Sequence, residues 1–291
     1  MKELGNEEVC IALGYFDSVH LGHRQLIEVT RNYANAHNIG SCVATFCNNA
    51  YKLFNSDDKQ VYTYVERCDL LKDMCDYILP MRFDSKLKNH TAEEFLHGLF
   101  LHHKIKAVVC GYDYLFGAGA KGDAKFLKAY SEAHGVECII VPQYDLDGTR
   151  VSTTIVKSLL LSGDVEKAND FLGAPFMLCG KVVHGRGAGR MFDIPTANIK
   201  FNSSKLLPAA GVYGTVCEID GEKFYGATNI GARPTFGLSK IAVETMLADF
   251  NDNIYDKEVK LYFHKHLRGV KKFETPAQLS RQVHKDMEWY K

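Results

Sequence analysis

The stretch "GYFDSVHLGHRQ", residues 14–25, joins two segments of different hydrophobic periodicity. Residues 9–16, "VCIALGYF", overlap its start and form a short apolar run typical of a buried strand. After it comes "RQLIEVTRNYANAH" (24–37), which predicts an amphipathic helix. A buried strand followed by a tight turn and a helix is the unit from which parallel α/β sheets are built. The stretch therefore predicts an α/β domain with two histidines, His20 and His23, in the turn before the helix.

The same alternation continues through the first half of the chain. Further strands are predicted over 39–47, 77–83, 105–112 and 136–142, and helices over 63–75, 91–104 and 124–135. Thr91 is the expected N-cap of its helix, because Glu94 follows three residues later and completes a capping box. This order predicts a Rossmann-like domain, a mainly parallel sheet covered by helices on both faces.

The second half of the chain has a different pattern. Residues 151–176 are predicted to be helical, and Gly173 and Pro175 end that run, so we place the domain boundary between 1–172 and 173–291. Strand segments follow at 176–185, 211–231, 242–250 and 257–267, with a hairpin signal at Asp-Gly 220–221. They predict a small antiparallel β-barrel. A last helix is expected to begin with Thr275 as N-cap and Pro276 as its first residue.

Composition narrows the class of protein. The chain has 291 residues and a formal net charge of zero, which does not favour nucleic acid or an anionic membrane surface as a partner. Its apolar runs are of strand length, so no membrane span is expected. The nine cysteines form no CxxC pair, a spacing that fits neither a zinc site nor a disulfide framework. We therefore expect a cytoplasmic protein with reduced thiols, and the sequence leaves its oligomeric state open.

The histidine turn has the chemistry of a phosphate site. In open α/β sheets, ligands bind beyond the carboxyl ends of the strands, where a helix amino terminus offers unpaired N–H groups. Imidazoles can donate hydrogen bonds to phosphate oxygens and stabilise charge that develops there, which suits His20 and His23. Gly22 allows close backbone approach, and Asp17 can cap the turn or help position a metal.

Three motifs in the first half resemble a known family. Residues 14–25 resemble the HxGH signature of the nucleotidyltransferase superfamily, in particular "GxFDGxHxGH" of prokaryotic bifunctional riboflavin kinase/FAD synthetases. "VVCGYDYLFGAGAKGD" (108–123) resembles "vvGeDFrFGxxxxGd", and "VSTTIVKSLL" (151–160) resembles "ISSTxIRxxL". The resemblance implies adenylyl transfer from ATP to FMN with His20 and His23 as catalytic residues. It also implies nucleotide and phosphate contacts by Gly14, Phe16, Asp17, Gly22, Gly111, Asp113, Phe116, Gly117, Ser152, Thr153, Thr154 and Lys157.

A glycine-rich loop in the second half precedes a "PTAN" motif. Gly185, Gly187 and Gly189 with Arg186 and Arg190 can wrap phosphates, although the loop alone is more typical of a hairpin with solvated arginines. In "PTAN", Thr196 and Asn198 face one side of an extended chain, and their hard oxygen atoms suit Mg²⁺. The motif resembles the "PTAN" signature of riboflavin kinases, which implies that these two residues help bind Mg²⁺ and the phosphates of ATP.

The resemblance extends to the end of the chain. "TNIGARPTFG" (228–237) resembles "NIGxRPTF", and residues 243–268 resemble "vExHLLDFxxdLYGkxixvxFxxxlR". Glu244 falls on the family's catalytic glutamate, a carboxylate suited to take the proton from the ribityl 5′-hydroxyl as that oxygen attacks the γ-phosphate. Flavin contacts are implied for Asn229, Arg233, Glu244 and Arg268.

The chain departs from the family pattern at several positions. Ser18 replaces a glycine, "TFCNNAYKLF" (45–54) lacks an acidic residue and a histidine of "TFDPHP", and Lys157 replaces an arginine. Ile194 and Asp256 depart in the kinase half, at positions that carry no chemistry.

These observations predict a bifunctional transferase. It would use riboflavin, FMN and ATP, with Mg²⁺ as its metal, and make FMN and then FAD. Three alternatives stay open: a riboflavin kinase whose first domain is degenerate, a flavin-binding sensor without turnover, and a nucleotidyltransferase with another phosphorylated acceptor.

Overall fold

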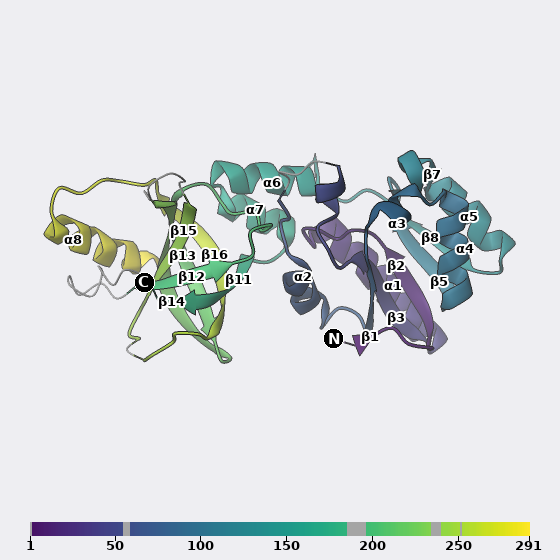
Figure 1. The fold of residues 1–291 in the computed structure, drawn as a ribbon, viewed down its shortest axis with the longest axis horizontal. Coiled ribbons are helices and arrows are strands. Elements are labelled where there is room, and N and C mark those ends of the chain that lie inside the picture. The colour runs from purple at the N-terminus through teal and green to yellow at the C-terminus, as the bar shows by residue number, and fades with distance from the viewer. Residues whose placement is uncertain (1, 55–58, 185–195, 234–239, 251) are drawn as a thin grey trace. The chain divides into compact units, whose positions relative to one another are not determined.

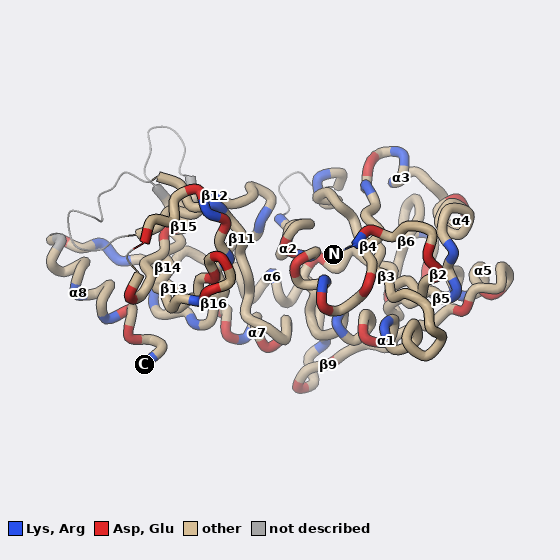
Figure 2. Tube along the Cα trace, turned by 90° about the horizontal axis from the view of Figure 1, so that it is seen from below, with Lys and Arg blue, Asp and Glu red and all other residues tan. Residues whose placement is uncertain are grey.

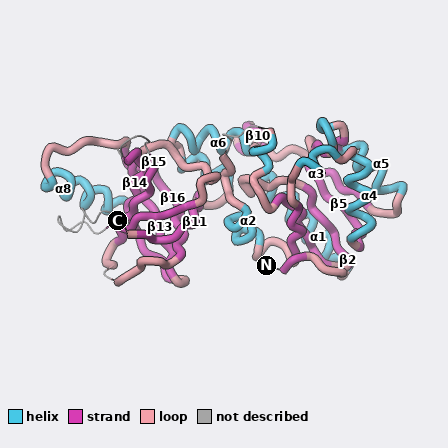
Figure 3. The backbone as a smooth tube through the Cα atoms, viewed as in Figure 1, coloured by secondary structure: helices cyan, strands magenta, loops and turns pink. Residues whose placement is uncertain are grey.

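Figure 1 shows a computed structural model of the chain, which describes residues 2–54, 59–184, 196–233, 240–250 and 252–291. The chain divides into two compact units, Met1–Thr153 and Thr154–Lys291. The first alternates strands and helices, whereas strands dominate the second (Figure 3). Lysines and arginines are interspersed with acidic residues along both units (Figure 2). Within the described ranges, no helix has the length and apolar character needed to cross a membrane.

The first unit is built on a six-stranded parallel sheet. The parallel arrangement and five of the strands were predicted, whereas the short strand Lys2–Glu3 was not. Its strands are β1 (Lys2–Glu3), β2 (Glu8–Leu13), β3 (Gly40–Phe46), β4 (Tyr77–Met81), β5 (Lys104–Gly111) and β8 (Glu137–Val141). They lie in the order β1-β4-β3-β2-β5-β8. From the central β2 the chain proceeds outward through β3 and β4, then crosses back to β5 on the other side. The strand order therefore reverses between β2 and β5, which is where such sheets bind ligands.

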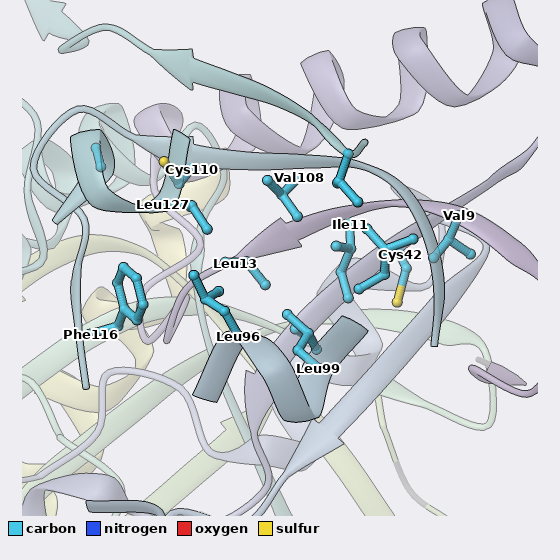
Figure 4. Packing of buried hydrophobic residues seen from close by; sticks show 14 of the residues in the cluster. Val9, Ile11, Leu13, Cys42, Leu96, Leu99, Val108, Cys110, Phe116 and Leu127 are labelled. Carbon is cyan, nitrogen blue, oxygen red and sulfur yellow. The ribbon is translucent and has the colours of Figure 1, made fainter. Parts of the chain in front are cut away.

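Helices pack on this sheet through its buried side chains. α1 (Leu21–His37), α4 (Ala92–His102) and α5 (Ala124–Ala133) contact the strands of the sheet, and the unit also contains α2 (Tyr64–Leu71) and α3 (Ser85–Asn89). Val9, Ile11 and Leu13 of β2 pack with Leu96 of α4 and Leu127 of α5 in one buried cluster (Figure 4). Successive residues of a strand face opposite sides, so the remaining buried residues of β2 face the other side, and α1 contacts β2, β3 and β5. Both faces of the sheet are thus covered.

Local signals in the sequence fix the helix ends. Thr91 and Glu94 form the predicted capping box, with the Thr91 N–H donating to Glu94 Oε2 at 2.8 Å. The run predicted as helical over 151–176 is instead two helices, α6 (Thr153–Ser162) and α7 (Val165–Leu172). They are separated because Gly163 has a positive φ of 87°, after which the Asp164 side chain caps α7.

The second unit contains the predicted barrel, which is closed and antiparallel. Its strands are β11 (Phe176–Val183), β12 (Thr196–Phe201), β13 (Gly211–Ile219), β14 (Glu222–Arg233), β15 (Lys240–Leu247) and β16 (Glu258–Arg268), in the order β11-β12-β15-β14-β13-β16. β13 and β14 form the predicted hairpin, with Asp220 and Gly221 both at positive φ. Inside the barrel, the buried hydroxyls of Thr215, Thr228 and Thr245 are joined in a chain by contacts of 2.7 and 2.9 Å.

A C-terminal helix completes the second unit. α8 (Pro276–Asp286) begins as predicted, because the Thr275 side chain accepts a hydrogen bond from the Gln278 N–H. It leads into the 3₁₀ turn η4 (Met287–Tyr290), where Trp289 Nε1 donates to the Gly226 carbonyl at 2.9 Å. A Cβ at Gly214 would lie 2.4 Å from the Trp289 ring, so only glycine fits beneath it.

Short elements that the sequence did not predict connect the main ones. They are the helix α3, the ribbons β6 (Leu115–Phe116) with β7 (Gly122–Asp123) and β9 (Asp145–Leu146) with β10 (Thr149–Arg150), and the 3₁₀ turns η1 (Ala50–Leu53) and η2 (Ala118–Ala120). All nine cysteines are free.

Candidate active sites

The two histidines of the first motif form one structural unit at the start of α1. The helix begins at Leu21, three residues earlier than predicted, and His20 is its N-cap. His20 Nδ1 accepts a hydrogen bond from the His23 backbone N–H at 3.1 Å. The two imidazoles stack in parallel, with centroids 3.6 Å apart and planes 5° from each other. The sequence motif thus fixes both rings through the helix terminus itself.

Burial keeps both imidazoles neutral. It lowers the pKa of His20 to about 4, and the positive charge of Arg150 lowers it further. Burial also holds the pKa of His23 well below its usual range, with smaller contributions from His20 and Arg67. Because His20 Nδ1 accepts a hydrogen bond, the proton of the neutral ring is on Nε2, which can donate. His23 Nδ1 is buried and has no hydrogen-bond partner among the described residues. The pair offers hydrogen-bond donors without adding charge.

A cavity of about 210 Å³ lies in front of the histidines, at the point where the strand order reverses. Seven residues predicted from the motifs line it: His20, Gly22, His23, Gly111, Asp113, Ser152 and Thr153. Segments far apart in the sequence, after β2, β5 and β8 and before α6, thus meet at one place. Arg150 and Tyr112 also line the cavity, and the sequence analysis missed both. Tyr112 lies within the motif at 108–123 and Arg150 directly precedes the motif at 151–160, but neither residue was assigned a role from the sequence.

Other predicted nucleotide-binding residues do not line this cavity. Thr154 and Lys157 follow Thr153 in α6. Phe116 is buried against Phe95 and Tyr114, and a Cβ on Gly117 would lie 2.6 Å from the Ala92 nitrogen. Packing therefore explains why Phe116 and Gly117 occupy these positions. Nucleotide contacts by Thr154, Lys157, Phe116 and Gly117 stay a prediction.

The turn before the histidines is held by Asp17. Its side chain is 2% exposed and accepts hydrogen bonds from the Val61 N–H and the Tyr51 hydroxyl, both at 3.0 Å. Gly14 and Phe16 belong to the same turn, and Phe16 has a positive φ of 52°. Asp17 thus fastens the segment containing the "TFCNNA" departure to the histidine turn, and its metal role stays a prediction.

A buried arginine secures the two ends of that segment. Arg67 of α2 is 0% exposed, donates from Nη1 to the Tyr62 carbonyl at 2.8 Å and from Nη2 to the Phe46 carbonyl, and lies over the Tyr15 ring at 5.0 Å. We call Arg67 with these three residues the Arg67 clamp. The Tyr15 hydroxyl in turn accepts from the Ala50 N–H and Gln60 Nε2, so the clamp continues into η1.

Ser18, which replaces a glycine of the family pattern, fits its place. It is fully buried, and its Oγ lies 2.9 Å from Thr153 Oγ1 in a hydrogen bond. The substitution therefore links the histidine turn to the start of α6.

The second candidate site is a row of polar residues across the barrel. In register, Asn198 of β12 lies opposite Glu244 of β15, and Glu244 lies opposite Asn229 of β14. Paired residues of adjacent strands share a face, and Thr196, two residues before Asn198, shares it too. The neighbouring Thr245 points into the barrel, so this row lies on the other side of the strands. The row brings together four residues that the motifs predicted separately.

The oxygen atoms of this row fit a divalent cation held partly by phosphates. Asn198 is 9% exposed, and its Oδ1 is buried without a hydrogen-bond partner among the described residues. Within those residues, no cluster of three His, Cys, Asp or Glu side chains is arranged to hold a metal. A cation here would therefore rely on oxygens such as those of Thr196 and Asn198 together with substrate, as is common for Mg²⁺.

Several predicted residues of the second domain fall elsewhere. The loop residues Gly185, Arg186, Gly187, Gly189 and Arg190, with Ile194, lie outside the described residues. Arg233 ends β14, and its side chain is also outside the described part. Arg268 forms a bidentate ion pair with Asp286 of α8, with Nη2 and Oδ2 2.7 Å apart. That pair fastens the C-terminal helix, and a flavin contact by Arg268 stays a prediction.

The neutral histidines make the first domain sensitive to acid. A histidine whose pKa is lower in the folded chain takes up a proton on unfolding, so stability is lost as the pH falls from 6.5 towards the folded pKa, about 4 for His20. We expect His20 alone to make the free energy of unfolding about 2 kcal/mol lower at pH 5 than at pH 7.5. Urea unfolding followed by circular dichroism at 222 nm checks this, because the chain's single tryptophan, Trp289, lies in the other unit.

His20→Asn provides the matched control for that experiment. Asparagine keeps an N-cap acceptor but does not titrate. The variant should lose about 2 kcal/mol less than the wild type over the same pH interval. An equal loss in both proteins would contradict the assignment.

Comparisons with known proteins identify a family for each half of the chain. Residues 2–155 match the family model for FAD synthetase, and residues 172–291 match the model for riboflavin kinase. The bifunctional riboflavin kinase/FMN adenylyltransferase of Bacillus subtilis is 30% identical over 95% of this chain and 89% of its own length. The Escherichia coli protein of the same description is 30% identical, over 98% and 93%.

A solved structure shares the fold of this chain over nearly its whole length. A crystal structure from Streptococcus pneumoniae, described as a macrolide-efflux protein, superposes with a TM-score of 0.88. It is 30% identical in sequence and covers 98% of this chain and 94% of its own. Both family models and the full-length relatives confirm the resemblance predicted from the motifs. The chain belongs to the family of bifunctional riboflavin kinase/FMN adenylyltransferases.

Proposed function

We propose that this chain makes FAD from riboflavin in two steps. The second domain transfers the γ-phosphoryl group of ATP to the ribityl 5′-hydroxyl of riboflavin, giving FMN and ADP. The first domain transfers AMP from a second ATP to FMN, giving FAD and pyrophosphate. The observation that carries the proposal is the stacked, neutral His20–His23 pair, which faces a cavity where the strand order of the sheet reverses. In the barrel of the same chain, Glu244 lies beside Asn198.

In the kinase step, Glu244 acts as the general base. Its carboxylate takes the proton from the 5′-hydroxyl as that oxygen attacks the γ-phosphorus and the bond to the β-phosphate oxygen breaks. Asn229 and Asn198 flank Glu244 in register, one on each side, and position the acceptor and the phosphates. Mg²⁺, held by Thr196 and Asn198, would neutralise phosphate charge when bound.

In the adenylyl step, the FMN phosphate is itself the nucleophile. One of its oxygens attacks the α-phosphorus of ATP, and the bond to the bridging oxygen breaks to release pyrophosphate. The nucleophile is already an anion, so the site needs no strong base. His20 Nε2 and the amino terminus of α1 donate hydrogen bonds to phosphate oxygens as charge moves onto them.

We also propose the domain boundary and the location of the protein. The boundary falls between Leu172 and Gly173, because Gly173 ends α7 in the left-handed conformation and the riboflavin kinase match begins at residue 172. By contacts, the connecting helices 154–172 nevertheless belong with the barrel, and Asn169 Nδ2 donates to the Phe263 carbonyl at 2.8 Å. Nine free cysteines support a cytoplasmic location.

A product assay tests the proposed function. The purified chain is incubated with riboflavin, ATP and Mg²⁺, and separately with FMN, ATP and Mg²⁺, and the flavins are separated by chromatography. We expect FMN in the first reaction and FAD in the second. FMN without FAD would reject the adenylyl step, and no new flavin in either reaction would reject both.

A further inference from the structure

Arg150 has a distinctive position beside the histidine cavity. It ends the short ribbon of β9 and β10, immediately before the Ser152 and Thr153 that line the same cavity. Among the described residues that line this cavity, it is the only lysine or arginine. Its side chain is 48% exposed, so a ligand in the cavity can reach it.

Two residues of the "GYDYLFG" motif hold the guanidinium of Arg150. Its Nη2 pairs with Asp113 Oδ2, and its Cζ lies 5.3 Å from the centroid of the Tyr112 ring. The Tyr112 hydroxyl donates to Gln143 Oε1 at 2.7 Å, and Gln143 Nε2 donates to Asp145 Oδ1 at 2.7 Å. The ring and the carboxylate together orient a planar, permanently charged group at the cavity edge.

A positive charge at this place would complement the negative charge of a bound triphosphate. The triphosphate of ATP is strongly anionic, whereas His20 and His23 are neutral and contribute only donors. Lys157, one helical turn after Thr153 in α6, replaces the arginine of the family pattern and lacks its forked geometry. A guanidinium at residue 150 can bind phosphate in the bidentate manner that a lysine cannot.

We propose that Arg150 binds the triphosphate of ATP during adenylyl transfer, and that Asp113 and Tyr112 pre-orient it for this contact. This inference rests on the proposed function of the first domain. When ATP enters, phosphate oxygens replace or share the Asp113 contact with the guanidinium. An exposed ion pair alone contributes little to folding, so a purely structural role predicts no effect on ATP.

Arg150→Gln in the full-length chain tests the proposal. The expected result is a rise of about 10- to 100-fold in the KM for ATP during FAD synthesis from FMN, the range typical of a lost charged hydrogen bond. Riboflavin phosphorylation by the same preparation should be unchanged. Arg150→Lys should fall between the wild type and the glutamine variant, because it keeps the charge without the fork.

Lys106→Gln is the matched control. Lys106 forms a similarly exposed ion pair with Glu8, at the amino end of β5 and away from the cavity. Its KM for ATP should stay within about twofold of the wild type. An Arg150→Gln protein with unchanged kinetics would overturn the proposal, as would an equal effect of Lys106→Gln.

A binding measurement separates this inference from the proposed function. If the wild type makes no FAD, the adenylyl step fails, and calorimetric titration with a non-hydrolysable ATP analogue then decides the role of Arg150. Weaker binding at one of two sites in Arg150→Gln supports the contact. Identical isotherms for the two proteins reject it.

Discussion

Replacing Glu244 with glutamine should lower the rate of FMN formation by about 100- to 10,000-fold, the usual contribution of a general base. Glutamine keeps the size and the hydrogen-bonding reach of the side chain but cannot take the proton from the 5′-hydroxyl. The row formed with Asn198 and Asn229 should persist, because the backbone pairing of β12, β15 and β14 does not depend on this side chain. The measurement is the initial rate of riboflavin phosphorylation at saturating ATP.

Two comparisons make that result specific. FAD synthesis from supplied FMN should continue in the Glu244→Gln protein, because the histidine pair lies in the other domain. Glu258→Gln, an exposed position on β16 of the same barrel, should leave both activities near the wild-type level. FMN formation at the wild-type rate in Glu244→Gln would remove Glu244 from the catalytic role.

Replacing His20 with asparagine should reduce FAD synthesis by about 100- to 1,000-fold, the range seen when a transition-state donor is removed. Asparagine preserves the N-cap of α1, so the helix terminus and His23 should keep their places. The substitution removes the Nε2 donor together with the ring that stacks on His23. The effect should appear in kcat, because the donor stabilises charge that develops during transfer.

The same helix supplies the control for this substitution. His37 is the last residue of α1, where its Nδ1 lies 2.9 Å from the Tyr33 carbonyl at the surface. His37→Asn should leave FAD synthesis unchanged, and riboflavin phosphorylation should be unchanged in both variants. A His20→Asn protein that makes FAD at the wild-type rate would show that the ring acts only as a cap.

The sequence predicted the main elements because their signals are local. Strand periodicity, the Thr91 and Thr275 caps and the Asp-Gly turn at 220 each depend on a few neighbouring residues. The strand order of the sheet and the closure of the barrel by β11 against β16 depend on pairing between distant segments, which no local pattern encodes. Ribbons of two residues per strand are too short to show periodicity.

The candidate sites show the same division between local and distant information. Motifs identified His20, His23 and Glu244, whose neighbours carry strong signatures. Arg150 reaches the cavity from a short ribbon, and its partner Asp113 is 37 residues away in sequence, so only the fold relates them. The burial of Asp17 could likewise not be predicted from the sequence, because its hydrogen-bond partners Tyr51 and Val61 come from a later segment.

The Arg67 clamp holds the segment between Phe46 and Tyr62 through backbone atoms, so its hydrogen bonds do not depend on the side chains of that segment. Its hydrogen bonds end on the backbone carbonyls of Phe46 and Tyr62, and carbonyls are present whatever the residue. Side chains between those two points can therefore differ without loss of the Arg67 hydrogen bonds, while Tyr51 adds a side-chain attachment to Asp17. Residues 47–50 of the "TFCNNA" departure lie between these two points, so this part of the segment differs from the family pattern while Arg67 holds both of its ends.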